Sequence, residues 1–141
     1  MQLPIKAHYA TIAVLALASR YDSGELVQAR VIAADHAVPS QFLGQILQQL
    51  RNAGLIVSVR GSSGGFRLAK SPDSISVADV VEAVCSSSAS ENNLPSHDPI
   101  TRVVGGVWQE LNETQLRYLE QLKLSSLVQQ MSPEPAAMFF I

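Results

Sequence analysis

One stretch, Ser40 to Lys70, constrains the fold more than any other part of the chain. Its first half is a glutamine-rich segment whose apolar side chains have the spacing of one helix face: Phe42, Leu43, Ile46, Leu47 and Leu50. Gly54 follows, and a residue free to adopt the left-handed conformation there ends a helix. Two β-like runs come next, Leu55–Arg60 and Gly65–Ala69, joined by a glycine-rich turn. A polar helix followed directly by a basic hairpin is the layout of a winged helix-turn-helix.

Composition places the chain among globular proteins. It has 141 residues, of which 47% are hydrophobic, enough for one domain with an appendage. The longest apolar candidate, Ala10–Ala18, is shorter than the roughly 18 residues that cross a membrane and lacks a secretory cleavage pattern. We therefore expect a cytoplasmic protein. The single cysteine, Cys85, excludes an internal disulfide and any metal site built from several thiolates of one chain.

Charge is divided unequally between the two halves of the chain. Residues 1–70 hold seven Lys and Arg against three Asp and Glu, whereas residues 71–141 hold three against nine. The overall net charge of −2 argues against nucleic-acid binding when taken alone. A basic first half can nevertheless face phosphate, so the distribution favours a nucleic-acid partner. Chance is the plain alternative, because the charges are few.

The whole pattern predicts a mainly α fold with a small β-hairpin wing. The segment Lys6–Arg20 is apolar nearly all round, so we expect a buried helix there. Further helices are expected over Gln28–His36, Ala78–Cys85 and Leu124–Met131. We predict four parts: a winged helix-turn-helix domain over residues 1–85, a flexible loop over 86–97, a dimerisation helix with a short terminal helix over 98–131, and a tail over 132–141.

A long helix is expected to begin at Asp98–Pro99 and to carry an apolar stripe of about 35 Å. A chain this small has too little core to cover such a stripe, so we expect a second copy in a two-fold dimer. Gly105–Gly106 costs roughly 1 kcal/mol per glycine, which predicts a late start, a bend or a closely approaching backbone. The residues expected at the dimer interface are Ile100, Val104, Val107, Trp108, Leu111, Tyr118 and Leu122.

Base reading is expected from the third helix and phosphate contacts from the hairpin. A glutamine side chain can bond both polar edge groups of adenine in the major groove, which makes Gln41 and Gln45 candidate base readers. The plain alternative is an amphipathic helix with a solvated glutamine face. The neighbouring Arg60 and Arg67, which can straddle a phosphate row or the minor groove, favour DNA binding.

Enzyme chemistry has no support in the sequence. The turn Gly61–Gly65 lacks the P-loop spacing and joins two strands instead of opening a helix. The serine-rich run Ser86–Ser90 has no general base placed by a motif. The candidate metal ligands lack the spacing of a metal site: His8, His36, Cys85 and His97. We therefore predict neither catalytic residues nor metal ligands.

With these motifs in this order, the sequence resembles the Rrf2 family of bacterial winged-helix regulators over about residues 1–130. The most specific part is Ala53–Ala69, AGLIVSVRGSSGGFRLA, with further matches at Lys6, Tyr9, Phe42, Val80, Trp108 and Leu111. The resemblance implies a homodimer crossed by the long helix and bound to double-stranded DNA at a palindromic operator, which we expect it to repress. The candidate DNA-contacting residues are Ser40, Gln41, Phe42, Gln45, Arg51, Arg60, Gly61, Ser62, Ser63, Gly64 and Arg67.

Two departures from the family pattern concern base preference and the cofactor. Gly44 stands where many members carry a glutamate, which can accept a hydrogen bond from cytosine, so the base preference should differ. Members with an iron–sulfur cluster carry three cysteines between the fourth helix and the long helix, whereas Ser86–Val107 has none. Arg102 and Gly105 occupy two of the ligand positions. We therefore expect no iron–sulfur cluster.

The signal and two other functions stay open. The effector can be a small molecule, a partner protein, or oxidation of Cys85, which needs an exposed thiol with a lowered pKa. Gly44, the overall acidity and the apolar segment Met138–Ile141 suit a protein-interaction module that has lost DNA binding. His8 stands where some family members place a ligand from the first helix, so a redox or metal sensor using His8 and Cys85 is the third reading.

Overall fold

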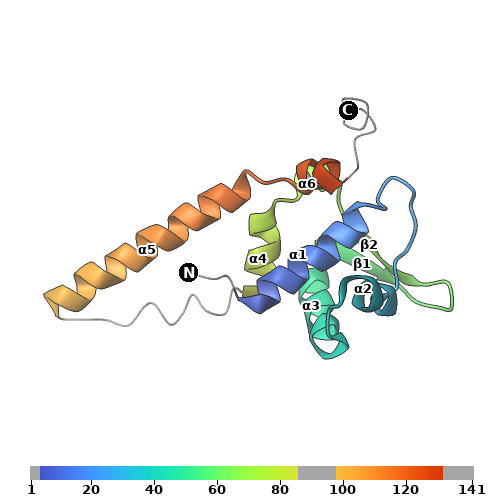
Figure 1. Cartoon of the computed structure of the whole chain (residues 1–141), viewed down its shortest axis with the longest axis horizontal. Helices are drawn as coiled ribbons and strands as arrows, with labels where there is room; N and C mark the ends of the chain where they lie inside the picture. The colour runs from blue at the N-terminus through green and yellow to red at the C-terminus, as the bar shows by residue number, and fades with distance from the viewer. Residues whose placement is uncertain (1–3, 86–97, 132–141) are drawn as a thin grey trace, which may run out of the picture.

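The computed structural model describes residues 4–85 and 98–131. The predicted loop over residues 86–97 and the predicted tail over 132–141 lie outside the described residues. In chain order the elements are α1 (Ile5–Ala18), α2 (Ala29–His36), α3 (Ser40–Asn52), β1 (Ile56–Val59), β2 (Gly65–Leu68), a 3-10 turn (Pro72–Ser74), α4 (Val77–Cys85), α5 (Pro99–Glu120) and α6 (Leu124–Met131). The expected mainly α fold with one small hairpin is confirmed (Figure 1).

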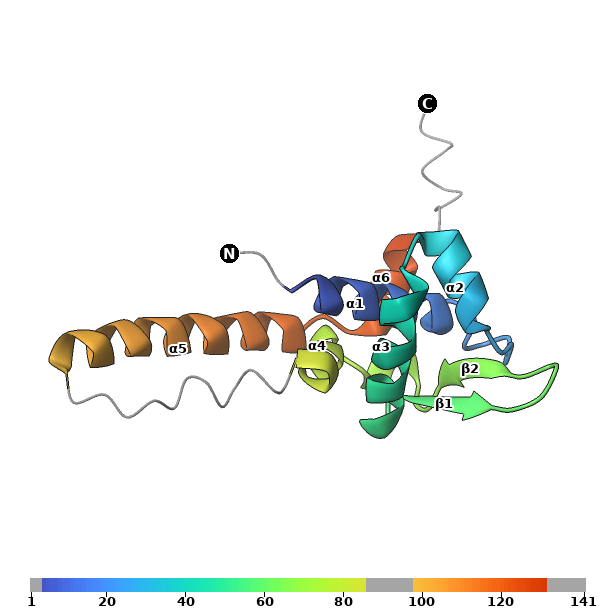
Figure 2. The ribbon, with the colours of Figure 1, turned by 90° about the horizontal axis from the view of Figure 1, so that it is seen from below.

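Helix α1 runs through the middle of the compact part of the molecule, with the other elements around it except α5 (Figures 1 and 2). The expected burial is confirmed for one face, where small side chains let neighbouring helices approach closely: Ala7, Ala10, Ala13, Val14, Leu17 and Ala18. The helix ends at Ala18, two residues earlier than predicted, because Arg20 and Tyr21 donate their backbone N–H groups to turn-type acceptors. This central helix is the frame on which the other elements are positioned.

Helices α2 and α3 form the helix-turn-helix. Helix α2 ends at His36, and its C-cap residue Ala37 adopts the left-handed conformation with a φ of 54°. Val38 is buried in the turn and donates its N–H to Ala33 O at 3.2 Å. Pro39 is the N-cap residue of α3. Because proline disfavours helical angles in the residue before it, Val38 cannot extend the helix toward the N-terminus. The turn therefore fixes the angle between the two helices.

Gly54, which was expected from the sequence to end the third helix, lies at the C-terminus of α3. Gly54 has a φ of 80°, in the left-handed region. Its N–H donates to Arg51 O at 3.0 Å, and the next N–H, of Leu55, donates to Leu50 O at 3.1 Å. This pair of bonds is the Schellman arrangement, which satisfies carbonyls at a helix end. It delivers the chain directly from α3 into β1.

The wing is an antiparallel pair of four-residue strands with a third short segment at its edge. The register pairs Ile56 with Leu68 and Val59 with Gly65. On the other side of β2, Val27 exchanges two backbone hydrogen bonds with Phe66, at 2.9 and 2.8 Å. The segment just before α2 therefore pairs with the wing and holds the hairpin against the body.

Helix α6 belongs to the compact body. Leu124 is fully buried in the main core. Its N–H donates to Ile75 O at 3.0 Å, while Leu122 O accepts from Val77 N at 2.9 Å. These bonds join the segment after α5 to the start of α4. Leu122 is half-buried against the chain's own second hydrophobic cluster, which consists of Ala7, Val77 and Val81, and its expected place at a dimer interface stays a prediction.

Helix α5 projects from the body as a single arm (Figures 1 and 2). Asp98 caps its N-terminus by accepting from Ile100 N and Thr101 N, and hydrogen bonds from Thr101 hold the Asp98 pKa below its usual value. The helix begins at Pro99 and is continuous through Gly105–Gly106, so a late start is excluded. It ends at Glu120, before the stripe's last predicted residue. No described helix is both long and apolar enough to span a lipid bilayer.

Candidate nucleic-acid interface

The exposed face of α3 is a row of amide side chains. Leu43, Ile46, Leu47 and Leu50 are buried on one side of the helix. Opposite them lie side chains spaced i, i+4, i+7 and i+11, all exposed: Gln41, Gln45, Gln48 and Asn52. Gln48 and Asn52 are not among the residues predicted from the sequence, although the same helical spacing from Gln41 would have found them. The row offers donors and acceptors to any ligand that lies along it.

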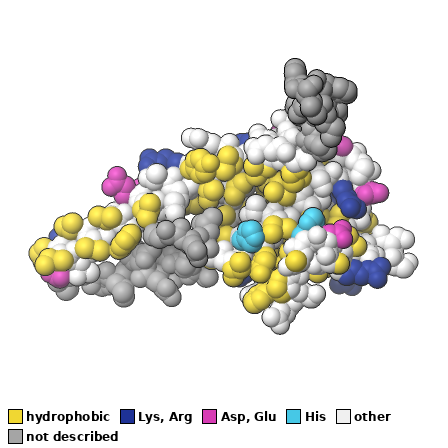
Figure 3. All heavy atoms as spheres, in the orientation of Figure 1, with side chains coloured by type: hydrophobic (Ala, Val, Ile, Leu, Met, Phe, Trp, Pro, Cys, Tyr) yellow, Lys and Arg dark blue, Asp and Glu magenta, His cyan; other side chains and the backbone are white. Residues whose placement is uncertain are grey.

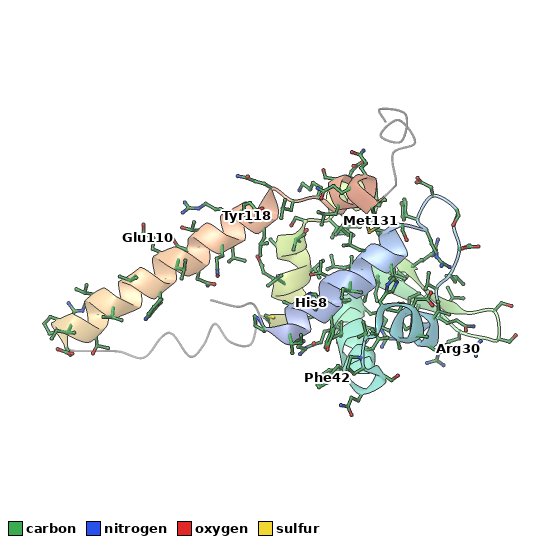
Figure 4. The ribbon with its side chains drawn as sticks, viewed as in Figure 1. His8, Arg30, Phe42, Glu110, Tyr118 and Met131 are labelled. Atoms are coloured by element: carbon green, nitrogen blue, oxygen red, sulfur yellow. The ribbon has the colours of Figure 1, made fainter. Side chains whose placement is uncertain are left out.

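Phe42, a predicted DNA contact, lies on one flank of this row. Its ring is 43% exposed and stacks on Tyr9 of α1, with ring centroids 6.3 Å apart and planes inclined by 28°. His8 lies beside Tyr9 at a centroid distance of 5.8 Å, and Figure 4 shows His8 and Phe42 at the same end of the body. The first turn of α3 is therefore tied to the first turns of α1.

The other flank of the row faces the hairpin across an open cavity of about 420 Å³. Its walls are Gly44, Gln48 and Arg51 of α3 on one side and Phe66 of β2 on the other. A side chain at Gly44 would meet nothing within 4 Å. The residue that departs from the family pattern therefore leaves space between the helix and the wing.

The hairpin turns one face toward α3 and the other toward solvent. Arg51 Nη1 donates to Ser58 Oγ at 3.4 Å, which links the end of α3 to the face of β1. Phe66 pairs with Ser58 and shares that face, whereas Arg67 pairs with Val57 on the opposite face. Arg60 follows β1 and is exposed at the start of the tip. The two predicted wing arginines thus belong to different parts of the hairpin.

Two glycines make the tip of the wing possible. Gly64 donates its N–H to Gly61 O at 3.0 Å, and a Cβ at Gly64 would collide with Val59 O. At Gly65 a Cβ would come within 2.8 Å of Val27 O, because the backbones of the two segments are in direct contact there. The exposed residues between the strands are Arg60, Gly61, Ser62 and Ser63. The tip is therefore a tight turn with an exposed cation and two hydroxyls.

Arg30 and the N-terminus of α2 lie beside this tip (Figure 4). Arg30, exposed at the start of α2, donates to Gln28 Oε1 at 2.7 Å and lies close to the hairpin end of the molecule (Figure 4). Lys and Arg side chains are concentrated at the same end in Figure 3. No side chain caps the N-terminus of α2 or α3. Free N–H groups at helix N-termini and arginine side chains are the usual phosphate ligands in DNA complexes, so Arg30 joins the candidate interface.

Among the described residues, His8 and Cys85 are not part of a grouping that could hold a metal ion. Cys85 is half-buried at the end of α4, and burial raises the pKa of its thiol, against the smaller lowering effect of the Lys6 charge. Among residues 4–85 and 98–131, no group of three or more His, Cys, Asp and Glu side chains is arranged to hold a metal. His97, the other candidate, is outside the described residues. A raised pKa is the opposite of what a reactive thiol needs.

Comparison with known proteins decides the family. The sequence profile described as "Rrf2: Iron-dependent Transcriptional regulator" matches residues 3–130. The chain belongs to the Rrf2 family. An Rrf2 relative, the HTH-type transcriptional regulator IscR of Cereibacter sphaeroides, is 31% identical over 96% of this chain and 93% of its own. The family assignment makes the protein a DNA-binding transcriptional regulator and not an enzyme.

Solved structures give the same fold for this Rrf2 chain. The T. potens IscR structure has a TM-score of 0.77 and 24% identity, covering 99% of this chain and 97% of that one. CymR (YrzC), described as the global cysteine regulator of B. subtilis, has a TM-score of 0.75 and 23% identity, covering 94% and 99%. These likenesses confirm the winged helix-turn-helix with a long C-terminal helix.

Proposed function

We propose that this Rrf2 protein is a homodimeric repressor that binds a palindromic DNA operator and acts without an iron–sulfur cluster. One observation carries the proposal: the exposed amide row of α3 lies beside a wing whose exposed tip carries Arg60, Ser62 and Ser63. An α-helix fits the major groove, and glutamine can pair with both edge groups of adenine. Gln41, Gln45 and Gln48 are the proposed base readers.

The wing and the helix ends supply the proposed phosphate contacts. Arg60, with Ser62 and Ser63 at the tip, can reach the backbone or minor groove next to the site that α3 reads. Arg51 is assigned a supporting role, since it already bonds Ser58. Arg67 faces away from α3 and is assigned a weaker contribution than Arg60.

The exposed arm is the support for a dimer. On α5, Ile100, Val107 and Tyr118 are 73%, 54% and 62% exposed, although all are apolar or aromatic. They share one stripe with Val104 and Leu111 at the alternating four- and three-residue spacing of a coiled-coil seam. A second copy related by a two-fold axis covers such a stripe with the same residues of its own. We therefore propose residues 4–85 with α6 as the DNA-binding unit and α5 as the dimerisation arm.

The donor set supports the proposal of a cluster-free protein. Iron–sulfur clusters are held mainly by cysteine thiolates, and the cluster-bearing proteins that this sequence resembles carry three of them in each chain. The family description names iron, but this chain has one cysteine, so even a dimer supplies two thiolates. The described residues contain no grouping around Cys85 that replaces the missing ligands. The residues present do not fit a cluster.

A random-duplex selection followed by a salt titration tests the proposal. We expect an enriched palindrome, with affinity that falls linearly with salt on logarithmic axes. Arg60→Ala should reduce the slope by about 1 for each lost phosphate contact per protomer. Lys123→Ala, which removes an exposed cation outside the interface, is the matched control. A selection without enrichment, together with a stable complex with another protein, would support the protein-interaction alternative instead.

Two further measurements test whether the protein represses or activates transcription and whether it carries an iron–sulfur cluster. A reporter whose promoter overlaps the selected operator should be expressed more strongly when the regulator is absent, and lower expression would identify an activator. For the cofactor, protein purified without oxygen should show no visible absorption and contain no iron. An absorbing, iron-containing sample would overturn the cluster-free part without affecting the operator result.

A further inference from the structure

A cavity of about 340 Å³ lies where α1, α2 and α6 meet, away from the DNA-binding face of α3. Its floor is aliphatic, with Ile12, Leu15 and Ala16 from α1 and Val31 and Ile32 from α2. Met131, the last residue of α6, closes one side, and Figure 4 shows it above α1. The volume is in the range of small-molecule sites, which usually combine an apolar lining with a few polar groups.

The polar groups of this cavity carry both signs of charge. Asp35 and His36, at the end of α2, make no side-chain hydrogen bond or ion pair with any residue that the structure describes. Arg20 Nη1 is 3.5 Å from Glu25 Oε2, a long contact that leaves other donors of the guanidinium free. A carboxylate, a guanidinium and an imidazole thus face an aliphatic floor across the same space.

We propose that this cavity binds a small α-amino acid with an apolar side chain. Asp35 would accept hydrogen bonds from its ammonium group, and Arg20 with His36 would donate to its carboxylate. The side chain lies on the aliphatic floor, where its burial supplies the apolar part of the affinity. A simple anion or cation fits less well, because the charges lining the cavity have both signs.

The position of the cavity also suggests what an occupant does. Val31, Ile32, Asp35 and His36 share one face of α2, the first helix of the helix-turn-helix, which packs on α3. An amino acid in the cavity joins α2 to α1 and α6, so it biases the placement of α3. Affinity for the amino acid and for the operator must then change by the same factor in each other's presence. This coupling rests on the proposed function, whereas binding itself does not.

Calorimetric titration of the full chain without DNA tests the site. L-leucine, L-methionine and L-phenylalanine are the probes, and we expect at least one to saturate the protein below about 10 mM. Isopentylamine and 4-methylpentanoate, which each lack one charged group of leucine, should bind at least about tenfold more weakly than leucine. Asp35→Asn should weaken amino-acid binding by a similar factor, whereas Asp22→Asn, an exposed aspartate outside the cavity, should not.

Two further variants complete the test: one fills the cavity, and the other alters the apolar segment Met138–Ile141. Ala16→Phe should abolish binding while the far-ultraviolet circular dichroism stays helical, and operator binding without the amino acid should persist. Saturation by none of the three amino acids, or binding unchanged by both Asp35→Asn and Ala16→Phe, would overturn the proposal. So would binding seen only after Phe139→Ser with Phe140→Ser, because the chain's own apolar segment would then be the occupant. Loss of operator binding alone would instead count against the proposed function.

Discussion

Phe42, in the first turn of α3, stacks on Tyr9 of α1 at a centroid distance of 6.3 Å. The contact joins α3 to the central helix of the body at the end of α3 that we propose enters the major groove. The resemblance to the Rrf2 family placed Phe42 among the expected DNA-contacting residues. The stacking gives it a second role, which is to hold the first turn of α3 in place.

Replacing Phe42 with alanine separates these two roles. Loss of the ring pair and of the partial burial should lower the free energy of unfolding by about 1–2 kcal/mol. Phe42→Tyr keeps the ring and should be nearly neutral. Chemical denaturation at a fixed protomer concentration measures both variants, because the proposed dimerisation would make apparent stability depend on concentration. An unchanged unfolding free energy combined with lost operator affinity would assign Phe42 to direct DNA contact only.

Glycines in the interface should respond to alanine in opposite directions. At Gly64 the added methyl group collides with Val59 O, so Gly64→Ala should destabilise the wing by about 1–3 kcal/mol and weaken operator binding. At Gly44 the methyl group meets open space inside a helix, so Gly44→Ala should raise the free energy of unfolding by up to about 1 kcal/mol. Thermal denaturation of the two variants side by side checks the sign. Two shifts of the same sign would contradict this account of the α3–wing arrangement.

Local chemistry explains how much of this architecture the sequence could predict. The end of α3 at Gly54 and the start of α5 at Asp98–Pro99 follow from residues adjacent in the chain, and both predictions are confirmed. Contacts between distant segments were not accessible in this way. The Tyr9–Phe42 stack and the pairing of Val27 with Phe66 depend on how α1, α3 and the wing meet. The site residues are placed by the fold, but their DNA contacts stay predictions.

The glycine pair in α5 provides a test of the dimer seam. Gly105 and Gly106 lie about 100° around the helix axis from Val104 and Val107 respectively, so both point away from the apolar stripe. A side chain at either position meets nothing within 4 Å in the described protomer. Each change to alanine should therefore raise the unfolding free energy by up to about 1 kcal/mol per protomer without altering the dimer dissociation constant. A weaker dimer in sedimentation experiments would place the glycines in the interface.

A charge on the apolar stripe of α5 should break the proposed dimer. Val107→Glu would bury an unpaired carboxylate from each protomer, which raises the dimer dissociation constant by at least about 100-fold. Gln109→Glu adds the same charge on the far side of the helix and should leave the dimer unchanged. Sedimentation velocity at several concentrations measures both constants. Equal effects of the two substitutions would show that net charge, and not the stripe, controls association.

The raised pKa of Cys85 predicts how protein stability and thiol reactivity depend on pH. Burial raises the pKa of its thiol, so the folded state binds this proton more tightly than the unfolded state does. The contribution of Cys85 to the free energy of unfolding is fully present below the pKa of an unfolded cysteine. It is lost as the pH rises through the higher pKa of the folded state. The rate of iodoacetamide alkylation, which follows the thiolate fraction, should therefore have its midpoint above that of a free cysteine. Cys85→Ser should leave operator affinity unchanged in the presence or absence of peroxide. An alkylation midpoint below that of free cysteine, with peroxide-sensitive operator binding only in the wild type, would restore the thiol-sensor reading.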